Sequence, residues 1–135
     1  MGYENLKSLG SSTTKYLYNG AEASLLETFD NHYPNNDYIV FIEAFEFTSL
    51  CPKTGQPDFA TIKIWYKPDM KCLESKSLKL YLGSFRMYGT FHEDCVNRIM
   101  NDLINLLHPK WLRVKGEFSS RGGIRFQPES FYRKI

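Results

Sequence analysis

The fold is decided by the segment Thr90-Phe-His-Glu-Asp-Cys-Val-Asn-Arg-Ile-Met-Asn-Asp-Leu-Ile-Asn-Leu-Leu-His-Pro109. Its apolar side chains recur at the spacing of an amphipathic helix, at Val96, Ile99, Met100, Leu103, Ile104 and Leu107. Thr90 and Glu93 have the spacing of a capping box at its start, and Pro109 ends it. Burying each of these side chains contributes roughly 1.5 to 3 kcal/mol before entropy is counted. We therefore expect this helix to be a main support of the fold.

A second helical pattern precedes this segment, over residues 75–87. Its apolar positions are Leu78, Leu82 and Phe85. Its basic stripe is formed by Lys76, Lys79 and Arg86. Glu74 stands at the junction where this helix begins, and backbone N–H groups are free at such junctions. The junction is therefore a candidate phosphate site, although short charged runs are usually solvated helix surface.

Strand patterns lie on the N-terminal side of both helices. Residues 38–48 are dense in β-branched and aromatic side chains, which predicts a strand buried on much of both faces. Residues 61–66 begin with polar and apolar positions in alternation, as expected of the returning strand of an antiparallel hairpin. The stretch 49–58 between them contains two prolines and one glycine, so it is predicted to be the loop at the hairpin tip.

A second hairpin is predicted at the C-terminal end. Residues 111–118 and 124–126 alternate again, and the glycine-containing stretch 119–123 is the turn between them. The order strand, strand, helix, helix, strand, strand predicts an α+β fold with a four-stranded antiparallel sheet and two long helices on one face. Such a sheet has two unpaired edges, which are usually relieved by pairing with another chain. We therefore expect a ring-like homo-oligomer.

The composition limits the domain count and the classes of partner. A chain of 135 residues suits one domain and leaves no room for a separate dinucleotide-binding domain. We expect a single domain over 37–135, preceded by an arm over 1–36 with one short helix at 21–29. With 17 basic and 15 acidic side chains, no strong attraction to nucleic acid or to a membrane is expected.

Neither the cysteines nor the glycines indicate a common cofactor site. The three cysteines cannot all pair with one another and include no C-x-x-C spacing, so we expect reduced thiols and no catalytic metal. No G-x-G-x-x-G or P-loop occurs. There is no long apolar stretch or signal-peptide pattern, which leads us to expect a cytoplasmic protein.

Two candidate catalytic residues flank the predicted hairpin tip. Cys51 ends the first strand two residues before Lys53, a cation that would stabilise its thiolate; the alternative is a small buried side chain. Asp58 follows after a bend through Gly55 and Pro57 that would return its carboxylate toward the thiol for proton transfer. The alternative for Asp58 is a solvated turn residue.

His92 and Glu93 open the second helix, where two titratable side chains meet the helix dipole. Glu93 either caps the helix through the Thr90 box or points outward and accepts paired N–H donors from a purine-like ring. Arg121 and the glycines that follow it form either an ordinary hairpin turn or a backbone approach to a phosphate.

Three pieces of the chain together resemble the single-module 7-cyano-7-deazaguanine reductases, the QueF family. These belong to the tunnelling-fold superfamily alongside GTP cyclohydrolase I. The pieces are Cys51-Pro-Lys-Thr-Gly-Gln-Pro-Asp58, Glu74-Ser-Lys-Ser-Leu-Lys-Leu-Tyr81 and the pair His92 and Glu93. The second piece is the most specific of the three, and the resemblance covers residues 38–135.

The resemblance implies an NADPH-dependent nitrile reductase of queuosine biosynthesis. Cys51 would attack the nitrile carbon of 7-cyano-7-deazaguanine to form a covalent thioimide, and Asp58 would transfer protons. Two hydrides from NADPH would then give the primary amine. The tunnelling fold closes into a β-barrel ring, and the resemblance implies two stacked pentameric rings.

The resemblance also implies two sets of binding residues. The deazapurine would be held by Leu73, Glu74, Ser75, His92 and Glu93. NADPH would be contacted by Ser75, Lys76, Arg121 and Gly122, the last two from a neighbouring subunit. A basic contact suits the extra 2'-phosphate of NADPH.

Two other functions stay open from the sequence. Glu93 with nearby cysteine and histidine motivates a metal-dependent pterin or purine hydrolase on the same fold, which bound zinc would support. The strand edges or the basic stripe motivate a non-catalytic interaction module. That module predicts that Cys51 is alkylated no faster than Cys72 or Cys95.

Overall fold

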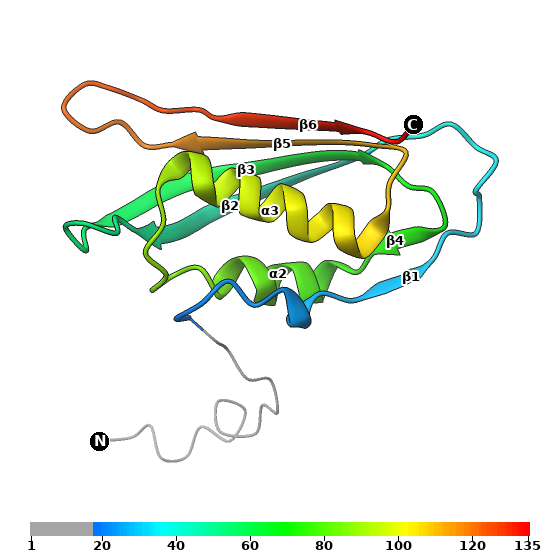
Figure 1. Ribbon diagram of the computed structural model, residues 1–135, viewed down its shortest axis with the longest axis horizontal. Helices are drawn as coiled ribbons and strands as arrows, with labels where there is room; N and C mark the ends of the chain where they lie inside the picture. The colour runs from blue at the N-terminus through cyan, green and yellow to red at the C-terminus, as the bar shows by residue number, and fades with distance from the viewer. Residues whose placement is uncertain (1–17) are drawn as a thin grey trace, which may run out of the picture.

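A four-stranded antiparallel sheet and two helices packed on one of its faces form the molecule (Figure 1). The computed structural model describes residues 18–135. The sheet has the order β2-β3-β5-β6, with strands β2 (Val40–Leu50), β3 (Pro57–Lys67), β5 (Trp111–Phe118) and β6 (Glu129–Arg133). The helices are α2 (Ser75–Gly83) and α3 (His92–Leu107). The predicted α+β class and the order of these six elements are confirmed.

Helix α3 lies along the middle of the sheet and supplies much of the core. Val96, Ile99 and Leu103 are fully buried, as the periodicity predicts. The predicted capping box is wrong: the N-cap is Phe91, with no side-chain cap. The backbone N–H of Thr90 donates to Leu50 O at 2.9 Å, which ties Thr90 to the end of β2. The helix therefore begins one residue later than the local signal predicts.

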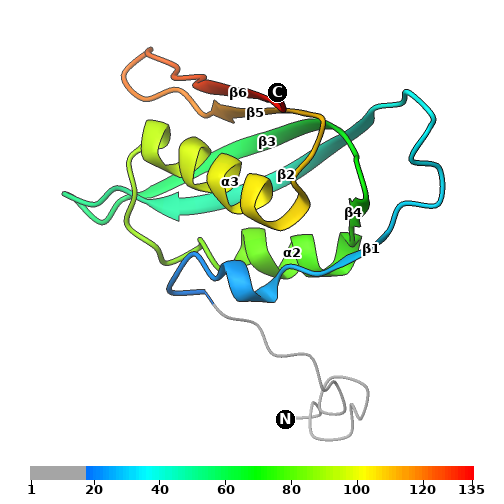
Figure 2. The same ribbon diagram turned by 45° about the vertical axis from the view of Figure 1, so that its right-hand side comes forward.

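Helix α2 is shorter than predicted and ends at Gly83 instead of continuing to Met87. Ser84 is buried at this end, and its hydroxyl donates to Tyr81 O and accepts from Glu22 N. The segment around Glu22 thus docks where the helix would have continued. Figure 2 shows α2 and α3 lying on the same side of the sheet.

Strand β2 buries only one face, so the predicted burial on both faces is wrong. Phe41 and Phe45 are 48% and 69% exposed. Phe41 stacks on Trp65 of β3 on the face away from the helices, with ring centroids 4.9 Å apart. A bulge between Ala44 and Phe47 interrupts the register with β3, and Glu46 within it has a positive φ of 62°. This edge strand is therefore interrupted by one bulge, with regular pairing to β3 on either side of it.

The helix predicted at 21–29 is replaced by two other elements. A three-residue 3-10 helix, η2 (Ala23–Leu25), is followed by strand β1 (Thr28–Asp30). Strand β1 pairs antiparallel with β4 (Lys71–Leu73), and together they form a small second sheet. The first part of the predicted arm, 1–17, lies outside the described residues.

The C-terminal hairpin has a longer connection than predicted, because its last strand is β6 and not 124–126. Gly122 and Gly123 both have positive φ and form the predicted turn between Arg121 and Ile124. Pro128 has no N–H to donate, so the pairing with β5 continues there on one side only, from Gly116 N to Pro128 O at 3.0 Å and from Phe118 N to Phe126 O at 3.2 Å. No helix within residues 18–135 is long and apolar enough to cross a membrane.

Candidate active site

The end of β2 and the start of α3 are joined by backbone contacts that bring Cys51 beside His92. Leu50 N donates to Tyr88 O at 3.0 Å, and Leu50 also bridges to Gly89. A Cβ added to Gly89 would lie 3.3 Å from the Cα of Pro52, so a glycine allows this close approach. The hairpin tip and the helix start thereby form the walls of one cavity.

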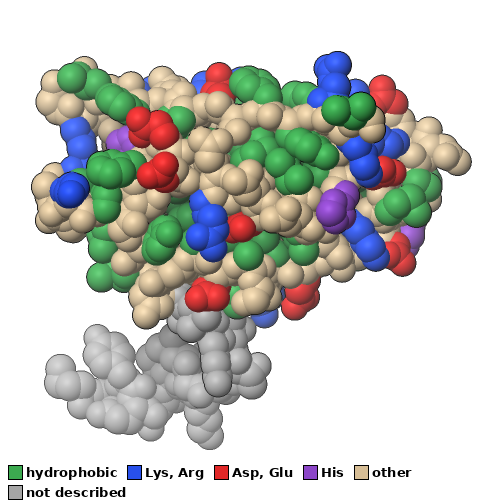
Figure 3. Space-filling model, viewed as in Figure 1, with side chains coloured by type: hydrophobic (Ala, Val, Ile, Leu, Met, Phe, Trp, Pro, Cys, Tyr) green, Lys and Arg blue, Asp and Glu red, His purple; other side chains and the backbone are tan. Residues whose placement is uncertain are grey.

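This cavity has a volume of about 350 Å³ and brings together five residues that were singled out from the sequence. They are Cys51, Asp58, His92, Glu93 and Arg121. Around them, the exposed side chains of Phe91, Ile124 and Phe126 supply apolar walls. At the end of the molecule where the β2–β3 loop lies, Figure 3 shows hydrophobic side chains beside acidic, basic and histidine side chains.

Asp58 lies in β3 and is only 5% exposed, so it is not a solvated turn residue. Its Oδ1 is 2.8 Å from Arg121 Nη2 and 3.3 Å from His92 Nε2. Arg121 also donates to the Pro57 carbonyl oxygen. Two nitrogen groups therefore converge on one oxygen of a buried carboxylate, and Arg121 does so within its own chain.

Cys51 is half-buried and lines this cavity. Hydrogen bonding to the Thr54 side chain, and then to the Thr54 and Lys53 backbone N–H groups, lowers the pKa of the Cys51 thiol. Burial and the Asp58 charge oppose this shift of the pKa. The backbone N–H of Lys53 is among the causes of this lowered pKa, while stabilisation by the Lys53 ammonium stays a prediction.

His92 and Glu93 occupy the first turn of α3 and differ in burial. The His92 ring stacks on Phe118, with centroids 3.9 Å apart and planes 12° apart, so packing and Asp58 together fix its orientation. Glu93 is exposed, and no side chain within residues 18–135 donates to its carboxylate. That carboxylate is available to accept hydrogen bonds from a ligand.

The other predicted binding residues, Leu73 to Lys76, lie at the opposite end of the molecule. Leu73 ends β4 and the next three residues lead into α2, whereas Cys51 follows β2 at the far end of the sheet (Figure 1). The Glu74 carboxylate accepts from Lys76 N at 2.8 Å and Ser77 N at 2.7 Å, which lowers its pKa. The backbone N–H groups expected to be free for a phosphate are therefore occupied by Glu74.

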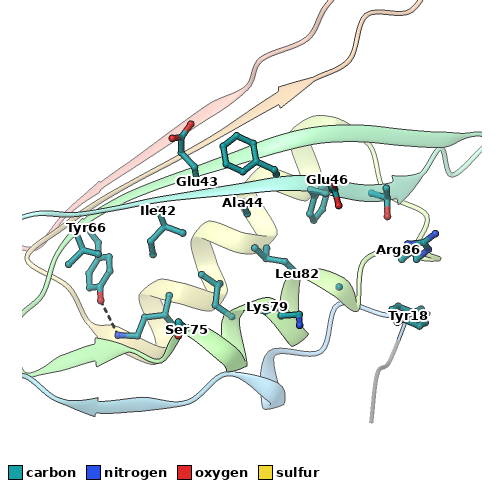
Figure 4. Close-up of a pocket in the computed structure, with 17 residues that line it drawn as sticks. Tyr18, Ile42, Glu43, Ala44, Glu46, Tyr66, Ser75, Lys79, Leu82 and Arg86 are labelled. Atoms are coloured by element: carbon teal, nitrogen blue, oxygen red, sulfur yellow. Dashed lines mark hydrogen bonds between the residues drawn. The ribbon is translucent and has the colours of Figure 1, made fainter. Parts of the chain in front are cut away.

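A second cavity, of about 520 Å³, lies between β2 and α2 (Figure 4). Leu73 and Ser75 contribute to its lining, and Ile42 and Leu82 point into it from the strand and the helix. The Tyr66 hydroxyl accepts from Leu73 N at 2.9 Å and fixes the backbone there. The structure thus divides the predicted site into two groups at opposite ends of the molecule, and Glu74, Lys76 and Gly122 line neither cavity.

Several site residues carry no obvious signal in the sequence. Thr54 lies three residues after Cys51 in a turn-prone loop. Only this spacing from Cys51 could have singled it out in the sequence. Phe118 and Phe126 belong to segments that read as ordinary strands. Within residues 18–135, no group of three or more His, Cys, Asp or Glu side chains is placed to hold a metal ion.

Comparison with known proteins identifies the family. Residues 57–134 match the family model described as QueF-like protein. An NADPH-dependent 7-cyano-7-deazaguanine reductase of Bacillus cytotoxicus is 60% identical over 124 residues, which are 92% of this chain and 74% of that protein. Proteins of the same name from Bacillus cereus and Bacillus mycoides are 59% and 58% identical over the same shares of each chain.

A solved structure supports the fold independently. The crystal structure of the archaeosine synthase QueF-Like in the apo form superposes with a TM-score of 0.68 at 17% identity, covering 74% of this chain and 98% of that one. At that identity the likeness concerns the fold alone. Together with the close relatives, these matches show that the chain belongs to the QueF-like family, with the NADPH-dependent 7-cyano-7-deazaguanine reductases.

Proposed function

We propose that this chain is an NADPH-dependent 7-cyano-7-deazaguanine reductase that acts in the cytoplasm, in queuosine biosynthesis. The observation that carries the proposal is the meeting of Cys51, Asp58 and Glu93 in one cavity with apolar walls. A nucleophile, a proton-transfer group and an acceptor for ring N–H groups are what a flat, nitrile-bearing heterocycle requires. Relatives that are 58% to 60% identical bear this name.

Cys51 is the proposed nucleophile. Its thiolate adds to the nitrile carbon, one carbon–sulfur bond forms, and the nitrile nitrogen takes up a proton to give a thioimide. Asp58, held at the cavity by Arg121 and His92, is positioned to move that proton. NADPH supplies the two hydrides that complete the reduction, and the carbon–sulfur bond breaks as the amine forms.

Glu93 is the proposed anchor of the deazapurine ring. Its carboxylate has two oxygens and accepts a pair of ring N–H donors in a bidentate arrangement. Phe91 and Phe126 supply apolar surface for the faces of the ring. His92, stacked on Phe118, lines the same cavity.

The proposed NADPH contacts fit an anionic dinucleotide. Ser75 and Lys76 are exposed at the start of α2. A Cβ added to Gly122 would meet no atom within 4 Å, so a phosphate has room to approach the backbone there. Arg121 adds a guanidinium to the same turn.

A second copy of the chain is proposed to complete the site, because Leu73 to Lys76 and Cys51 lie at opposite ends of one molecule. The edges of the sheet, β2 and β6, are the proposed contacts of a ring. The resemblance implies two stacked pentameric rings. Mixed assemblies of Cys51→Ala and Glu74→Ala chains, each inactive alone, are expected to regain activity. Mixed oligomers that form and stay inactive would contradict the shared site.

The direct test is the loss of NADPH absorbance when 7-cyano-7-deazaguanine is added. Wild type is expected to turn over, and Cys51→Ala is expected to be inactive. Cys72→Ser is the matched control, since Cys72 is buried and its sulfur lies 3.6 Å from the Tyr38 hydroxyl, outside the cavity. Turnover by Cys51→Ala at the wild-type rate would rule out covalent catalysis.

A further inference from the structure

The hydroxyl of Ser49 is buried and has no partner. Ser49 lies near the end of β2, two residues before Cys51, and is 0% exposed. Among residues 18–135, its Oγ is the one buried side-chain nitrogen or oxygen atom without a hydrogen-bond partner. Ser84 is equally buried, but its hydroxyl donates to Tyr81 O and accepts from Glu22 N. Because an unpaired buried hydroxyl destabilises the fold, the hydroxyl of Ser49 calls for an explanation.

Ser49 stands directly opposite Asp58. The two residues are register partners in the antiparallel pair of β2 and β3. Both belong to the buried face that the helices cover, Ser49 beside Phe47 on β2 and Asp58 beside Ala60 on β3. Residues directly opposite each other on one face have Cβ atoms about 4.5 to 5.5 Å apart. A turn of the unheld Ser49 side chain about χ1 therefore brings its hydroxyl within reach of the carboxyl group.

The partners that Asp58 has in the cavity suit its ionised form. Arg121 Nη2 lies 2.8 Å and His92 Nε2 lies 3.3 Å from the same oxygen, Oδ1. An arginine only donates hydrogen bonds, and a histidine accepts at Nε2 only as the neutral tautomer with its proton on Nδ1. When Asp58 takes up a proton, its carboxyl gains an O–H group that needs an acceptor, and Arg121 cannot be that acceptor.

Three other titratable groups lie around Asp58. Cys51 and Glu93 line the same cavity, on the side open to a ligand. Burial, and then the charge of Asp58, raise the pKa of the Cys95 thiol to about 12, so this thiol stays protonated and is a weak acceptor. The oxygen of Ser49 is neutral, lies on the buried side of the site and accepts as readily as it donates.

We propose that Ser49 is a positioning residue that accepts a hydrogen bond from the carboxyl group of Asp58 while Asp58 holds a proton. The inference rests on the proposed function, in which Asp58 takes the thiol proton of Cys51 and passes it to the nitrile nitrogen. Ser49 keeps its own hydrogen throughout, so no additional proton enters or leaves the reaction. Because the contact forms only with the protonated acid, the hydroxyl is unpaired beside a carboxylate that Arg121 contacts.

The test is a double-mutant cycle of urea midpoints at neutral pH, without substrate or NADPH. Ser49→Ala removes an unpaired hydroxyl from wild type and is expected to raise the midpoint. Asp58→Asn supplies an N–H donor where the protonated acid has its O–H, so Ser49→Ala is expected to lower the midpoint in that background. If Asp58→Asn does not fold, lowering the pH until Asp58 binds a proton should remove the gain that Ser49→Ala gives wild type. Ser84→Ala, which removes a paired hydroxyl, is the matched control and lowers the midpoint in both backgrounds.

Kinetics test the positioning role. Ser49→Ala is expected to lower kcat about five- to tenfold, as for one hydrogen bond, and to leave the KM for the nitrile unchanged because the contact forms only during the reaction. Ser84→Ala leaves kcat unchanged.

Equal midpoint changes for Ser49→Ala in the two backgrounds, or an unchanged kcat, would overturn the inference. Opposite midpoint changes in a protein that does not reduce the nitrile would keep the contact and refute the proposed function. Nitrile reduction without coupling between Ser49 and Asp58 would do the reverse.

Discussion

The guanidinium of Arg121 lies 2.8 Å from the carboxylate of Asp58, and both groups belong to the same chain. Asp58 is almost fully buried, and a buried carboxylate is stable only with partners. His92 contacts the same oxygen at 3.3 Å but is charged only when protonated. Arg121 is therefore the permanent cation of this cavity, and it supports Asp58 beside Cys51.

Arg121→Gln is expected to lower kcat about tenfold, because Asp58 loses its fixed partner and its charge then disfavours the Cys51 thiolate. The loss of stability is about 1 kcal/mol, less than for a fully buried pair because Arg121 is partly exposed. Urea unfolding and steady-state kinetics measure both. Arg125→Gln, in the same connection, is the control. If the effects of Arg121→Gln and Asp58→Asn simply add, the two side chains are not coupled.

Glu93→Gln is expected to raise the KM for the nitrile substrate at least about tenfold, because one of two charge-assisted hydrogen bonds to the ring is replaced by a donor. Asp94→Asn is the matched control, since both acids lie in the first turn of α3 and only Glu93 lines the cavity. Equal changes of KM in the two variants would indicate a general effect of helix charge and argue against a ring anchor.

Local pattern was sufficient to predict α3, because a stripe of apolar side chains on a helix must be buried. It was insufficient wherever a distant hydrogen bond competes with a local signal. The bond from Thr90 N to Leu50 O moves the helix start, and the docking of Glu22 on Ser84 ends α2 early. Strand β1 was mistaken for a helix because its short polar sequence acquires strand geometry only by pairing with β4.

The candidate site was predictable in its chemistry and not in its arrangement. Cys51, Asp58 and Glu93 are marked by residue type and by their place in loops and helix starts. The pairing of Asp58 with Arg121 joins two hairpins, and no spacing in the chain encodes it. Likewise, the distance between Cys51 and Glu74 follows from the direction of β2 and β4 in the fold.

Gly116→Ala is expected to destabilise the fold by about 1 to 3 kcal/mol through overpacking. An added Cβ would lie 2.7 Å from Phe118 Cε2 and 2.8 Å from Val96 Cγ2, both in the core. It would also displace the ring on which His92 stacks, so kcat falls with stability. Gly83→Ala is the control, since nothing lies within 4 Å of its added Cβ. Matching urea midpoints for Gly116→Ala and wild type would contradict the close packing.

Glu74 is expected to make folding stability depend on pH in acid. Its carboxylate accepts from Lys76 N and Ser77 N, so its pKa in the folded state is lower than its ordinary value of 4.5. A lowered folded-state pKa contributes stability above pH 4.5 that is lost as the pH falls through the folded-state value. Wild type should therefore be more stable than Glu74→Gln near neutral pH. The difference in their free energies of unfolding, the stability gap, should shrink as the pH is lowered. A gap that stays constant down to pH 2 would refute the lowered pKa.

Tyr81→Phe is expected to destabilise the protein by about 1.5 to 3 kcal/mol, the range for a hydrogen bond to a charged group. The fully buried Tyr81 hydroxyl donates to Asp102 Oδ2 at 2.6 Å, and Arg98 Nε donates to the same oxygen at 3.0 Å. Burial, and then Asp102, raise the pKa of Tyr81, so the hydroxyl stays a donor at ordinary pH. Urea unfolding measures the loss, with exposed Tyr33→Phe as control.

Because Arg98 also donates to Ala21 O at 2.7 Å, the Tyr81→Phe variant should loosen the packing of the 20–30 segment against α3. Unchanged hydrogen exchange at Leu25 and Leu26, whose N–H groups bond within this segment, would show that the network does not extend that far.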